Sequence, residues 1–572
     1  MMQRFCMGIM GVMLATSGML AGCGDLESEA LCQPDEEGCV CRDRITGAPC
    51  YDSEARDCLC SESDSSYPEE ASDYRGEPSA GDFSNSAPAD FEPEQEEAFS
   101  FLRPKSSQNY VYVANSNQDS VARINGDTLE IVSIEVGDRP TVVQTSKSTD
   151  TAVVLNEGSA EVSIIHSDST GDSVVNLPVR EGFNQLVISP GGRYALTYLD
   201  YDGASIETDF GKFQDVNLVR LEEGKEAVFN VAVGFHVLEI EFDVAGEKAY
   251  VISEDGVSVL TLDEVDTDFD AQPVVVTRDR LEDVLAIDRE VEVTPSGKLA
   301  VVRTSELQGL NVVQLGTFQG QIVEVPLPSV PTDLDLFKHS NRAIAVLKEV
   351  RKVALLDLDL VISAPEQAVR LIDIPEGPLG LATLDESTNS AFLYSVASEE
   401  PSLVKLNLET EAQVVWDVRK RVTGLSVSPD SGHAIIFHGI DSAPRSPADS
   451  DILIASSWAY SMLNLETGFT KLQTTRSRPG DFVFGDDPQW LFVALDGVST
   501  DVRQVDRVNL MTFRVDSYSL ASPPVSLGLL PSSTTPRVYV SQEHPVGRMT
   551  FFEVESGDAK TVTGYELNSQ VD

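Results

Sequence analysis

The feature that most constrains this chain is a pattern of short apolar runs that recurs ten times after residue 105. The first unit contains YVYVAN (110–115), SVARIN (120–125) and EIVSIEV (130–136), with polar turn residues between the runs. Alternation with a period of two, bounded by Gly, Pro, Asn and Asp, predicts strands joined by tight turns. The corresponding first run of each unit starts at Tyr110, Ala152, Tyr194, Ala249, Leu299, Ala343, Ala391, Ala434, Leu491 and Val538.

The spacing of these starts, about 42 to 57 residues, is the length of one four-stranded β-propeller blade. A single unit cannot bury both faces of its sheet, so we expect stability to come from stacking and ring closure. We therefore predict an all-β propeller over residues 106–572, with Val251, Val257 and Val259 in the layers between blades. The number of blades stays open between seven and ten. Ten units give one ring or two smaller ones, and the commoner seven or eight blades would make some units embellishments.

The repeats resemble the YVTN-type β-propeller family, which is related to WD40 proteins. The resemblance covers residues 110–567 and is carried by Tyr112-Val113-Ala114-Asn115, by Val136-Gly137 with Pro140, and by the Ser-Pro turns at 189–192 and 428–432. No unit contains the literal YVTN sequence, and Trp416-Asp417 is the one Trp-Asp pair, which we interpret as coincidence. In this scheme the chain enters at a second strand, so residues 98–104 are a candidate for the missing inner strand.

The N-terminus carries a different signal. Arg4 precedes an uncharged, largely apolar stretch (5–19), and Leu20-Ala21-Gly22-Cys23 follows at once. A basic start, a short apolar run and small residues at the cleavage position predict a secretory signal peptide over 1–22. The Leu-Ala-Gly-Cys ending resembles the bacterial lipobox, which implies lipidation of Cys23. No later run reaches the about 18 apolar residues of a membrane-spanning helix. We therefore expect a lipid-anchored, extracytoplasmic protein; Gly24 after the lipidated Cys favours the outer membrane.

Six further cysteines lie in a short segment after the anchor. They form two similar groups, each a Cys, a polar loop and then Cys-x-Cys, within residues 23–61. An even number of cysteines in an oxidising compartment favours a disulfide framework, although Cys-x-Cys also occurs in thiolate metal sites. The disulfide candidates are Cys32, Cys39, Cys41, Cys50, Cys58 and Cys60.

Acidic residues dominate the segment that joins this region to the repeats. Between residues 24 and 100 there are 22 Asp or Glu and four Lys or Arg. Residues 62–105 are therefore expected to form an extended, disordered linker. The net charge of the whole chain, −52, argues against nucleic-acid binding.

The sequence contains no catalytic motif that we can identify. A phosphate-binding Gly-rich loop, H-E-x-x-H and G-x-S-x-G are all absent. The six histidines are scattered, and His433 and His438 fall on opposite faces of one expected strand because their spacing is odd. Asp263, Asp266, Asp268 and Asp270 lie at intervals that suit Ca²⁺, but Ala271 and Thr277 replace the Gly and Glu of an EF-hand. Calcium is thus the weaker alternative to an exposed acidic loop, and no other cofactor is expected.

These observations favour a non-enzymatic envelope protein whose propeller binds a protein or glycan partner. Loops at one end of a rigid ring can vary freely, and insertions at 200–215, 263–282 and 440–457 are long enough to build a binding surface. The alternative is an extracytoplasmic hydrolase resembling sugar lactonases, for which no catalytic residue maps onto this sequence.

Overall fold

The computed structural model describes residues 39–43, 58–62, 102–200, 213–276, 289–305, 307–316, 321–377, 379–396, 402–441, 443–496, 500–531 and 534–565. The chain divides into two compact units, Met1–Glu94 and Gln95–Asp572. In the first unit, strands β1 (Cys39–Asp43) and β2 (Cys58–Glu62) form an antiparallel pair. The second unit contains all ten predicted repeats.

The first five blades follow one another along the chain, each starting at the strand nearest the centre. Blade 1 comprises β3 (Lys105–Ser106), β4 (Tyr110–Asn115), β5 (Ser120–Asn125) and β6 (Ile131–Glu135). Blade 2 comprises β7 (Pro140–Thr145), β8 (Thr151–Asn156), β9 (Glu161–Asp168) and β10 (Gly171–Pro178). Blade 3 comprises β11 (Gln185–Ile188), β12 (Tyr194–Tyr198), β13 (Asp215–Arg220) and β14 (Ala227–Ala232), joined by β18 (Phe269–Asp270). Blade 4 comprises β15 (Val237–Phe242), β16 (Lys248–Ser253) and β17 (Val257–Thr261), and blade 5 comprises β19 (Arg289–Val293), β20 (Leu299–Thr304), β21 (Gly309–Gln314) and β22 (Ile322–Pro326).

The other five blades all have four strands. Blade 6 comprises β23 (Asp333–Leu336), β24 (Arg342–Leu347), β25 (Lys352–Asp357) and β26 (Val369–Asp373). Blade 7 comprises β27 (Leu381–Asp385), β28 (Ser390–Tyr394), β29 (Ser402–Asn407) and β30 (Gln413–Asp417). Blade 8 comprises β31 (Val422–Val427), β32 (His433–His438), β33 (Trp458–Asn464) and β34 (Thr470–Thr475). Blade 9 comprises β35 (Pro479–Phe484), β36 (Trp490–Leu495), β37 (Gln504–Asn509) and β38 (Arg514–Ser519), and blade 10 comprises β39 (Pro524–Leu530), β40 (Arg537–Gln542), β41 (Arg548–Glu553) and β42 (Ala559–Thr563).

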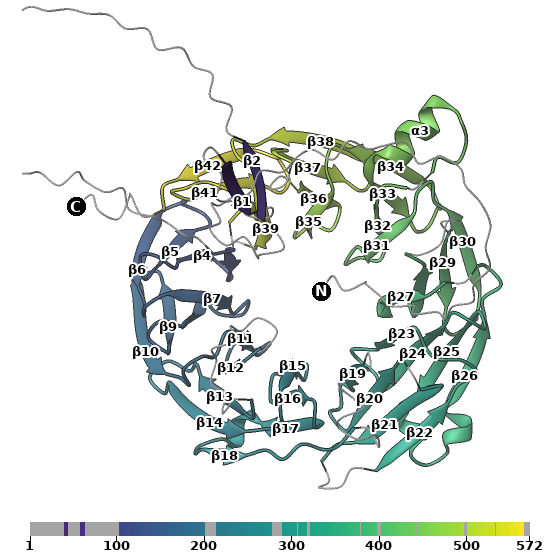
Figure 1. Ribbon diagram of the computed structural model, residues 1–572, viewed down its shortest axis with the longest axis horizontal. Coiled ribbons are helices and arrows are strands. Elements are labelled where there is room, and N and C mark those ends of the chain that lie inside the picture. Colours follow the sequence, from purple (N-terminus) through teal and green to yellow (C-terminus); the bar gives the residue numbers. More distant parts are fainter. Residues whose placement is uncertain are drawn as a thin grey trace, which may run out of the picture. The chain divides into compact units, whose positions relative to one another are not determined.

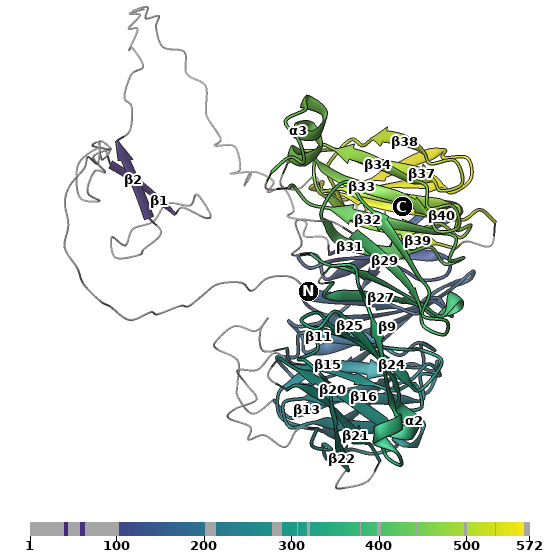
Figure 2. The same ribbon diagram turned by 90° about the vertical axis from the view of Figure 1, so that its right-hand side faces the viewer.

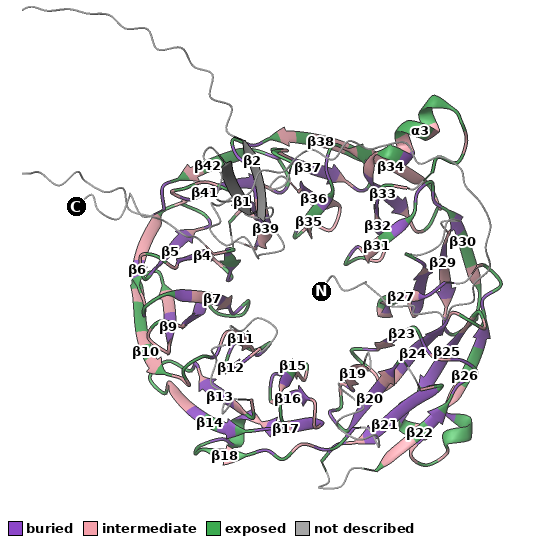
Figure 3. Cartoon of the chain, in the orientation of Figure 1, coloured by how far each residue is buried: buried purple, intermediate pink, exposed green. Residues whose placement is uncertain are grey.

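The ten blades form one closed ring, with the first strand of each blade nearest its axis (Figure 1), and we call this inner side of the ring the channel wall. Ten separate hydrophobic clusters hold the ring together, and each cluster joins two neighbouring blades. Val251 packs toward blade 3 and Val257 toward blade 5, as expected for residues between blades. The middle strands are largely buried, whereas outer strands such as β10, β38 and β42 are not (Figure 3). The all-β propeller is confirmed, and the alternatives of fewer blades or two rings are wrong.

The ring closes by face-to-face packing rather than by exchange of a strand between the chain ends. Blade 1 is built from the start of this unit and blade 10 from its end. Their shared cluster includes Ile124, Leu530 and Phe551. The Ser106 hydroxyl donates to the Leu529 carbonyl at 2.8 Å across this interface. The inner strand of blade 1 is β3, which follows the predicted segment 98–104; of that segment the structure describes 102–104, and the Leu102 amide donates to the Ala114 carbonyl.

Blade 4 departs from the predicted four strands. After β17 the chain forms the short η2 helix (Leu262–Glu264), and β18 then pairs in parallel with β14 of blade 3. The chain returns to blade 4 at a single bridge between Val257 and Val274. Pro273 lacks an amide hydrogen, so this stretch cannot continue a regular ladder beside β17. Residues 262–274 therefore link blades 3 and 4 at the rim.

Helices are short and lie in connections between strands. In the described ranges they are, besides η2, the helices α2 (Leu358–Val361), η3 (Pro365–Gln367), η4 (Glu386–Thr388) and α3 (Asp449–Ser456). None of the helices in the described ranges is long and apolar enough to pass through a bilayer.

Candidate binding surfaces

The two ends of the ring carry different kinds of connection. In antiparallel blades, the links from first to second and from third to fourth strand lie at one end, which we call the turn end. The links from second to third strand and from one blade to the next lie at the other, which we call the insertion end. The connections from β12 to β13 and from β32 to β33, and the one entering β19, reach the insertion end. Figure 2 shows α3 and α2 on opposite faces of the ring.

This arrangement confirms that two of the predicted insertions, 200–215 and 440–457, begin and finish at one end, although residues 201–212 lie outside the described part. The third, 263–282, is not a single loop. Its first residues lie at the turn end, β18 then follows blade 3, and only from Ala271 does the chain reach the insertion end. Residues 277–288 are outside the described ranges.

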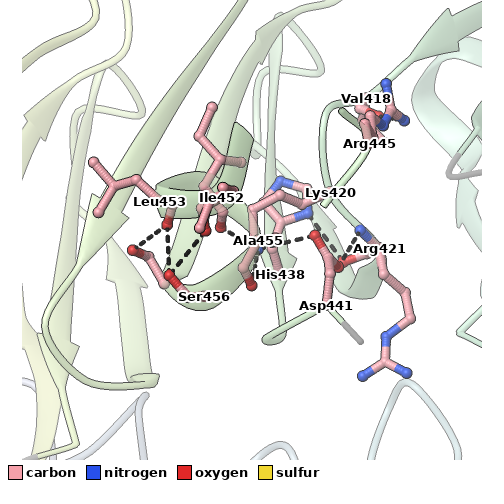
Figure 4. A network of polar contacts seen from close by, with 12 residues as sticks. Val418, Lys420, Arg421, His438, Asp441, Arg445, Ile452, Leu453, Ala455 and Ser456 are labelled. Carbon is pink, nitrogen blue, oxygen red and sulfur yellow. Dashed lines mark hydrogen bonds and ion pairs between the residues drawn. The ribbon is translucent and has the colours of Figure 1, made fainter. Parts of the chain in front are cut away.

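A buried lysine fixes α3 to the ring (Figure 4). The Lys420 side chain is fully buried, and its ammonium group pairs with the Asp441 carboxylate at 3.1 Å. It also donates to the carbonyls of Ile454, at 2.7 Å, and Ala455, at 3.3 Å. These carbonyls belong to the last turn of α3, where the helix has unsatisfied acceptors and a partial negative charge. A cation there stabilises the helix end and attaches it to blade 8.

A second attachment holds the connection between β32 and β33 at Arg445, before α3 begins. The Arg445 guanidinium donates to the Val418 carbonyl at 2.7 Å and pairs with Asp417 at 3.2 Å. Held in this way, α3 exposes Ile452 (47%) and Leu453 (63%) to solvent. Other apolar residues exposed at the insertion end include Phe235, Val275, Val396 and Ile440. The excursion is thus a positioned apolar surface rather than a free loop.

The predicted aspartate cluster is divided among different partners. Asp263 accepts a hydrogen bond from the Tyr194 hydroxyl at 2.9 Å, and Asp268 accepts one from the Asn230 amide at 2.8 Å. Asp266 and Asp270 are exposed. Within the described part of the chain, no three His, Cys, Asp or Glu side chains lie close enough together to hold a metal ion. Calcium binding at these four residues stays a prediction with no support from this geometry.

The histidines have separate local partners. His438 is buried between the Arg421 carbonyl, at 3.1 Å, and the Ser461 hydroxyl, at 2.8 Å, and burial lowers its pKa to about 4. His433 packs on the opposite face of β32, near Phe513. His166 pairs with Glu226 at 3.2 Å. Trp416 stacks on Phe392 in the cluster between blades 7 and 8, which is a packing role.

The cysteine predictions fall partly outside the described residues. Cys23, Cys32 and Cys50 lie there. Cys39 and Cys41 are in β1, Cys58 and Cys60 are in β2, and the register places Cys41 opposite Cys60. Disulfide formation and lipidation both stay predictions.

A set of carboxylates on the first strands of blades 4, 5 and 6, which we call the acidic arc, was not predicted from the sequence. They occupy two equivalent positions on the first strands of blades 4, 5 and 6, and the residue between the two positions is apolar and packs toward the preceding blade. The signal was present in the alternating acidic and apolar residues of 238–242, 289–293 and 333–336. The members of the arc are Glu239, Glu241, Glu290, Glu292, Asp333 and Asp335.

Some of these carboxylates accept hydrogen bonds from backbone amides of the next blade. Glu241 accepts a hydrogen bond from the Val293 amide at 3.2 Å, and Asp333 accepts one from the Ala382 amide at 2.6 Å. Each first strand has an unpaired edge toward the channel, so such bonds stabilise the inner wall. A carboxylate has room for several donors, and one amide leaves capacity for another partner.

Burial and mutual repulsion raise the pKa of several carboxyls in the acidic arc. Burial, followed by repulsion from Glu241 and other members of the arc, raises the pKa of Glu292 to about 8. Burial raises the pKa of Glu241 to about 7, and burial with repulsion from Asp333 raises that of Asp335 to about 7. Arg303 neutralises Glu290 at 2.6 Å, whereas in the described ranges no ion pair reaches Glu241, Glu292 or Asp335. These three carboxyls therefore have no cationic partner within the described part of the chain.

No protein-family model matches the chain, and no curated protein matches it. Among solved structures, a eukaryotic initiation factor is similar at 12% identity over 70% of this chain and 95% of that one, with a TM-score of 0.45. Dihydro-heme d1 dehydrogenase NirN is similar at 12% identity over 74% of each chain, TM-score 0.40. Apo AztD from Citrobacter koseri is similar at 11% identity over 82% and 95%, TM-score 0.36. At these values no residue role is carried over.

Proposed function

We propose that this chain is a cell-envelope lipoprotein whose propeller is a binding scaffold for a protein or glycan partner, with no catalytic role. The observation that carries the proposal is the difference between the two ends of the ring. Long excursions gather at the insertion end, and one of them is attached by the buried Lys420 so that Ile452 and Leu453 stay exposed. A rigid ring that presents such a surface suits recognition.

A matched pair of substitutions tests the binding surface. Leu453 at the insertion end and Met511 at the turn end are 63% and 67% exposed. We expect Leu453→Glu to reduce capture of an envelope protein or glycan by the full chain, because a charge opposes burial in an interface. Met511→Glu should leave capture unchanged. Equal effects of the two substitutions, or no captured partner at all, would contradict the proposal.

The anchor is tested separately by cell fractionation. Cys23→Ser should move the chain from the membrane fraction to the soluble fraction, since the acyl chains supply the membrane affinity. Cys6→Ser, within the expected signal peptide, should leave it in the membrane fraction. Retention of the Cys23→Ser chain in the membrane would refute lipidation at this residue.

A further inference from the structure

The cysteines that the structure describes in the first unit belong to one face of the ribbon formed by β1 and β2. Cys39 and Cys41 are two positions apart on β1, and Cys58 and Cys60 are two positions apart on β2. Residues two apart on a strand share a face, and so do residues directly opposite each other. Because Cys41 is opposite Cys60, all of these cysteines belong to the same face.

The register places one pair of cysteines at the separation that a disulfide requires. Residues directly opposite in an antiparallel pair have Cα atoms about 4.5–5.5 Å apart, and disulfides join Cα atoms about 4.4–6.8 Å apart. Cys41 and Cys60 are directly opposite. A bond between them therefore needs no rearrangement of the two strands.

The other combinations within the ribbon are too long for a disulfide. Cys39 is opposite Glu62, which makes Cys60 its diagonal neighbour, and Cys58 and Cys41 are related in the same way. Diagonal neighbours are about 7–8 Å apart. The two cysteines of one Cys-x-Cys group are also about 7 Å apart while their strand is extended. Both separations exceed the disulfide range.

The same register disfavours a single metal ion bound by the cysteines of both strands. Cys39 and Cys58 are offset by four positions, which is about 13 Å along the strands. Two sulfurs on one zinc ion lie within about 5 Å of each other, because each Zn–S bond is about 2.3 Å long. Cysteine side chains are too short to make up the difference.

The ribbon has little apolar surface of its own. Each strand has five residues, and the apolar residues besides cysteine are Val40 in β1 and Leu59 in β2. A two-stranded sheet by itself is marginally stable in water. A covalent bond between the strands would stabilise it by closing the connection 42–59 in the unfolded chain as well.

We infer that Cys41 and Cys60 form a disulfide bond that fixes the register of β1 and β2. Each thiol loses one proton and one electron, and a disulfide oxidant of the glutathione or oxidoreductase class accepts both electrons and both protons and becomes two thiols. The inference rests on the envelope location in the proposed function, because such bonds persist in oxidising compartments.

This bond also limits how the other four cysteines of the segment can pair. Four cysteines allow three pairings. The offset between Cys39 and Cys58 excludes the pairing that joins them. Cys39 is therefore bonded to Cys32 or to Cys50, and Cys58 to the other one.

Thiol trapping of the full chain, purified from cells without reductant, tests the inference. N-ethylmaleimide alkylates free thiols, and mass spectrometry of the peptides locates the modified residue. We expect Cys41→Ser to expose the thiol of Cys60, and Cys60→Ser to expose that of Cys41. Cys39→Ser is the matched control, because the same substitution two positions away should leave both residues protected and expose Cys32 or Cys50.

The unsubstituted chain gives a measurement that does not depend on how a variant folds. Thermolysin cleaves before residues such as Val40 and Leu59, which separate the cysteines of each group. The digest should contain a Cys41 peptide linked to a Cys60 peptide. Linkage of either residue to a different cysteine would overturn the inference, as would bound zinc in molar equivalence with both thiols free.

Oxidative refolding separates the pairing from the location. The reduced full chain is refolded in a glutathione buffer and mapped in the same way. If the bond between Cys41 and Cys60 forms there but the chain from cells is fully reduced, the envelope location is wrong and the pairing is supported. If Cys41 and Cys60 stay free or find other partners after refolding, the pairing is wrong whatever the location.

Discussion

The second strands of the blades are alike around the ring, whereas the first strands are not. Strands such as β4 and β8 are buried along their whole length, because both of their faces pack against neighbouring blades. The first strand has one edge toward the channel, and its residues change from blade to blade. At one equivalent position, blades 4 to 6 have Glu241, Glu292 and Asp335, whereas blades 7 to 9 have Thr383, Ser426 and Val483.

The second strands therefore provide the stability of the ring, whereas the first strands are free to provide specificity. Apolar second strands are required wherever two blades stack, so their pattern repeats ten times. First strands need only backbone pairing and a buried residue at alternate positions, which leaves the other positions free to carry charge. The acidic arc uses this freedom.

The largest expected effect concerns ring closure. Phe551 and Phe552 are neighbours on β41 and are each 1% exposed, but Phe551 packs on blade 1 and Phe552 on blade 9. In a closed ring, Phe551→Ala and Phe552→Ala should each lower the free energy of unfolding by about 3–5 kcal/mol, measured by urea denaturation. A much smaller effect of Phe551→Ala would show that blades 10 and 1 do not pack together.

The next effect is at the attachment of α3. Lys420→Met should destabilise α3 by about 2–3 kcal/mol, because Asp441 and the helix carbonyls lose a charged donor. Hydrogen exchange of the amides in 449–457 should accelerate. Lys405→Met, at a half-exposed lysine on β29, serves as the control. Unchanged exchange in Lys420→Met would mean that the ion pair does not hold the excursion.

A smaller effect is expected from pH. The folded pKa of Glu292, about 8, lies above its ordinary value, so its proton stabilises the fold below the ordinary pKa and that contribution is lost as pH rises through 8. Between pH 7 and 9, where His438 is neutral, stability should fall by up to about 1.4 kcal/mol per pH unit for each such carboxyl. Chemical denaturation should show a flatter dependence for Glu292→Gln than for Thr383→Val, which removes a hydroxyl at the same position of blade 7. Parallel curves would contradict the raised pKa.

The smallest effect is expected at the exposed apolar residues of the insertion end. Leu453→Ser should change the free energy of unfolding by less than about 0.5 kcal/mol, because the side chain is largely in water already. Thermal denaturation checks this expectation. A large loss would show that Leu453 packs within the fold and is not a free surface.

The difference between first and second strands also explains which features could be predicted from the sequence. The ten starts at Tyr110 to Val538 each fall within or at the edge of a second strand, because burial on both faces leaves a local apolar pattern. The link of β18 to blade 3 was not predictable, since a two-residue parallel pairing leaves no periodic signal. In the sequence the acidic arc corresponds to three short acidic stretches. Each stretch taken alone predicts only an exposed strand edge.

By itself, the sequence determined that the chain makes ten similar antiparallel modules, because strand periodicity and turn residues act over a few neighbouring positions. Only the tertiary structure decided that these modules close into one ring without exchanging a strand, and which residues then meet. Glu241, Glu292 and Asp335 are far apart along the chain, and they become neighbours because stacked blades bring the same strand position of successive modules together at the channel wall.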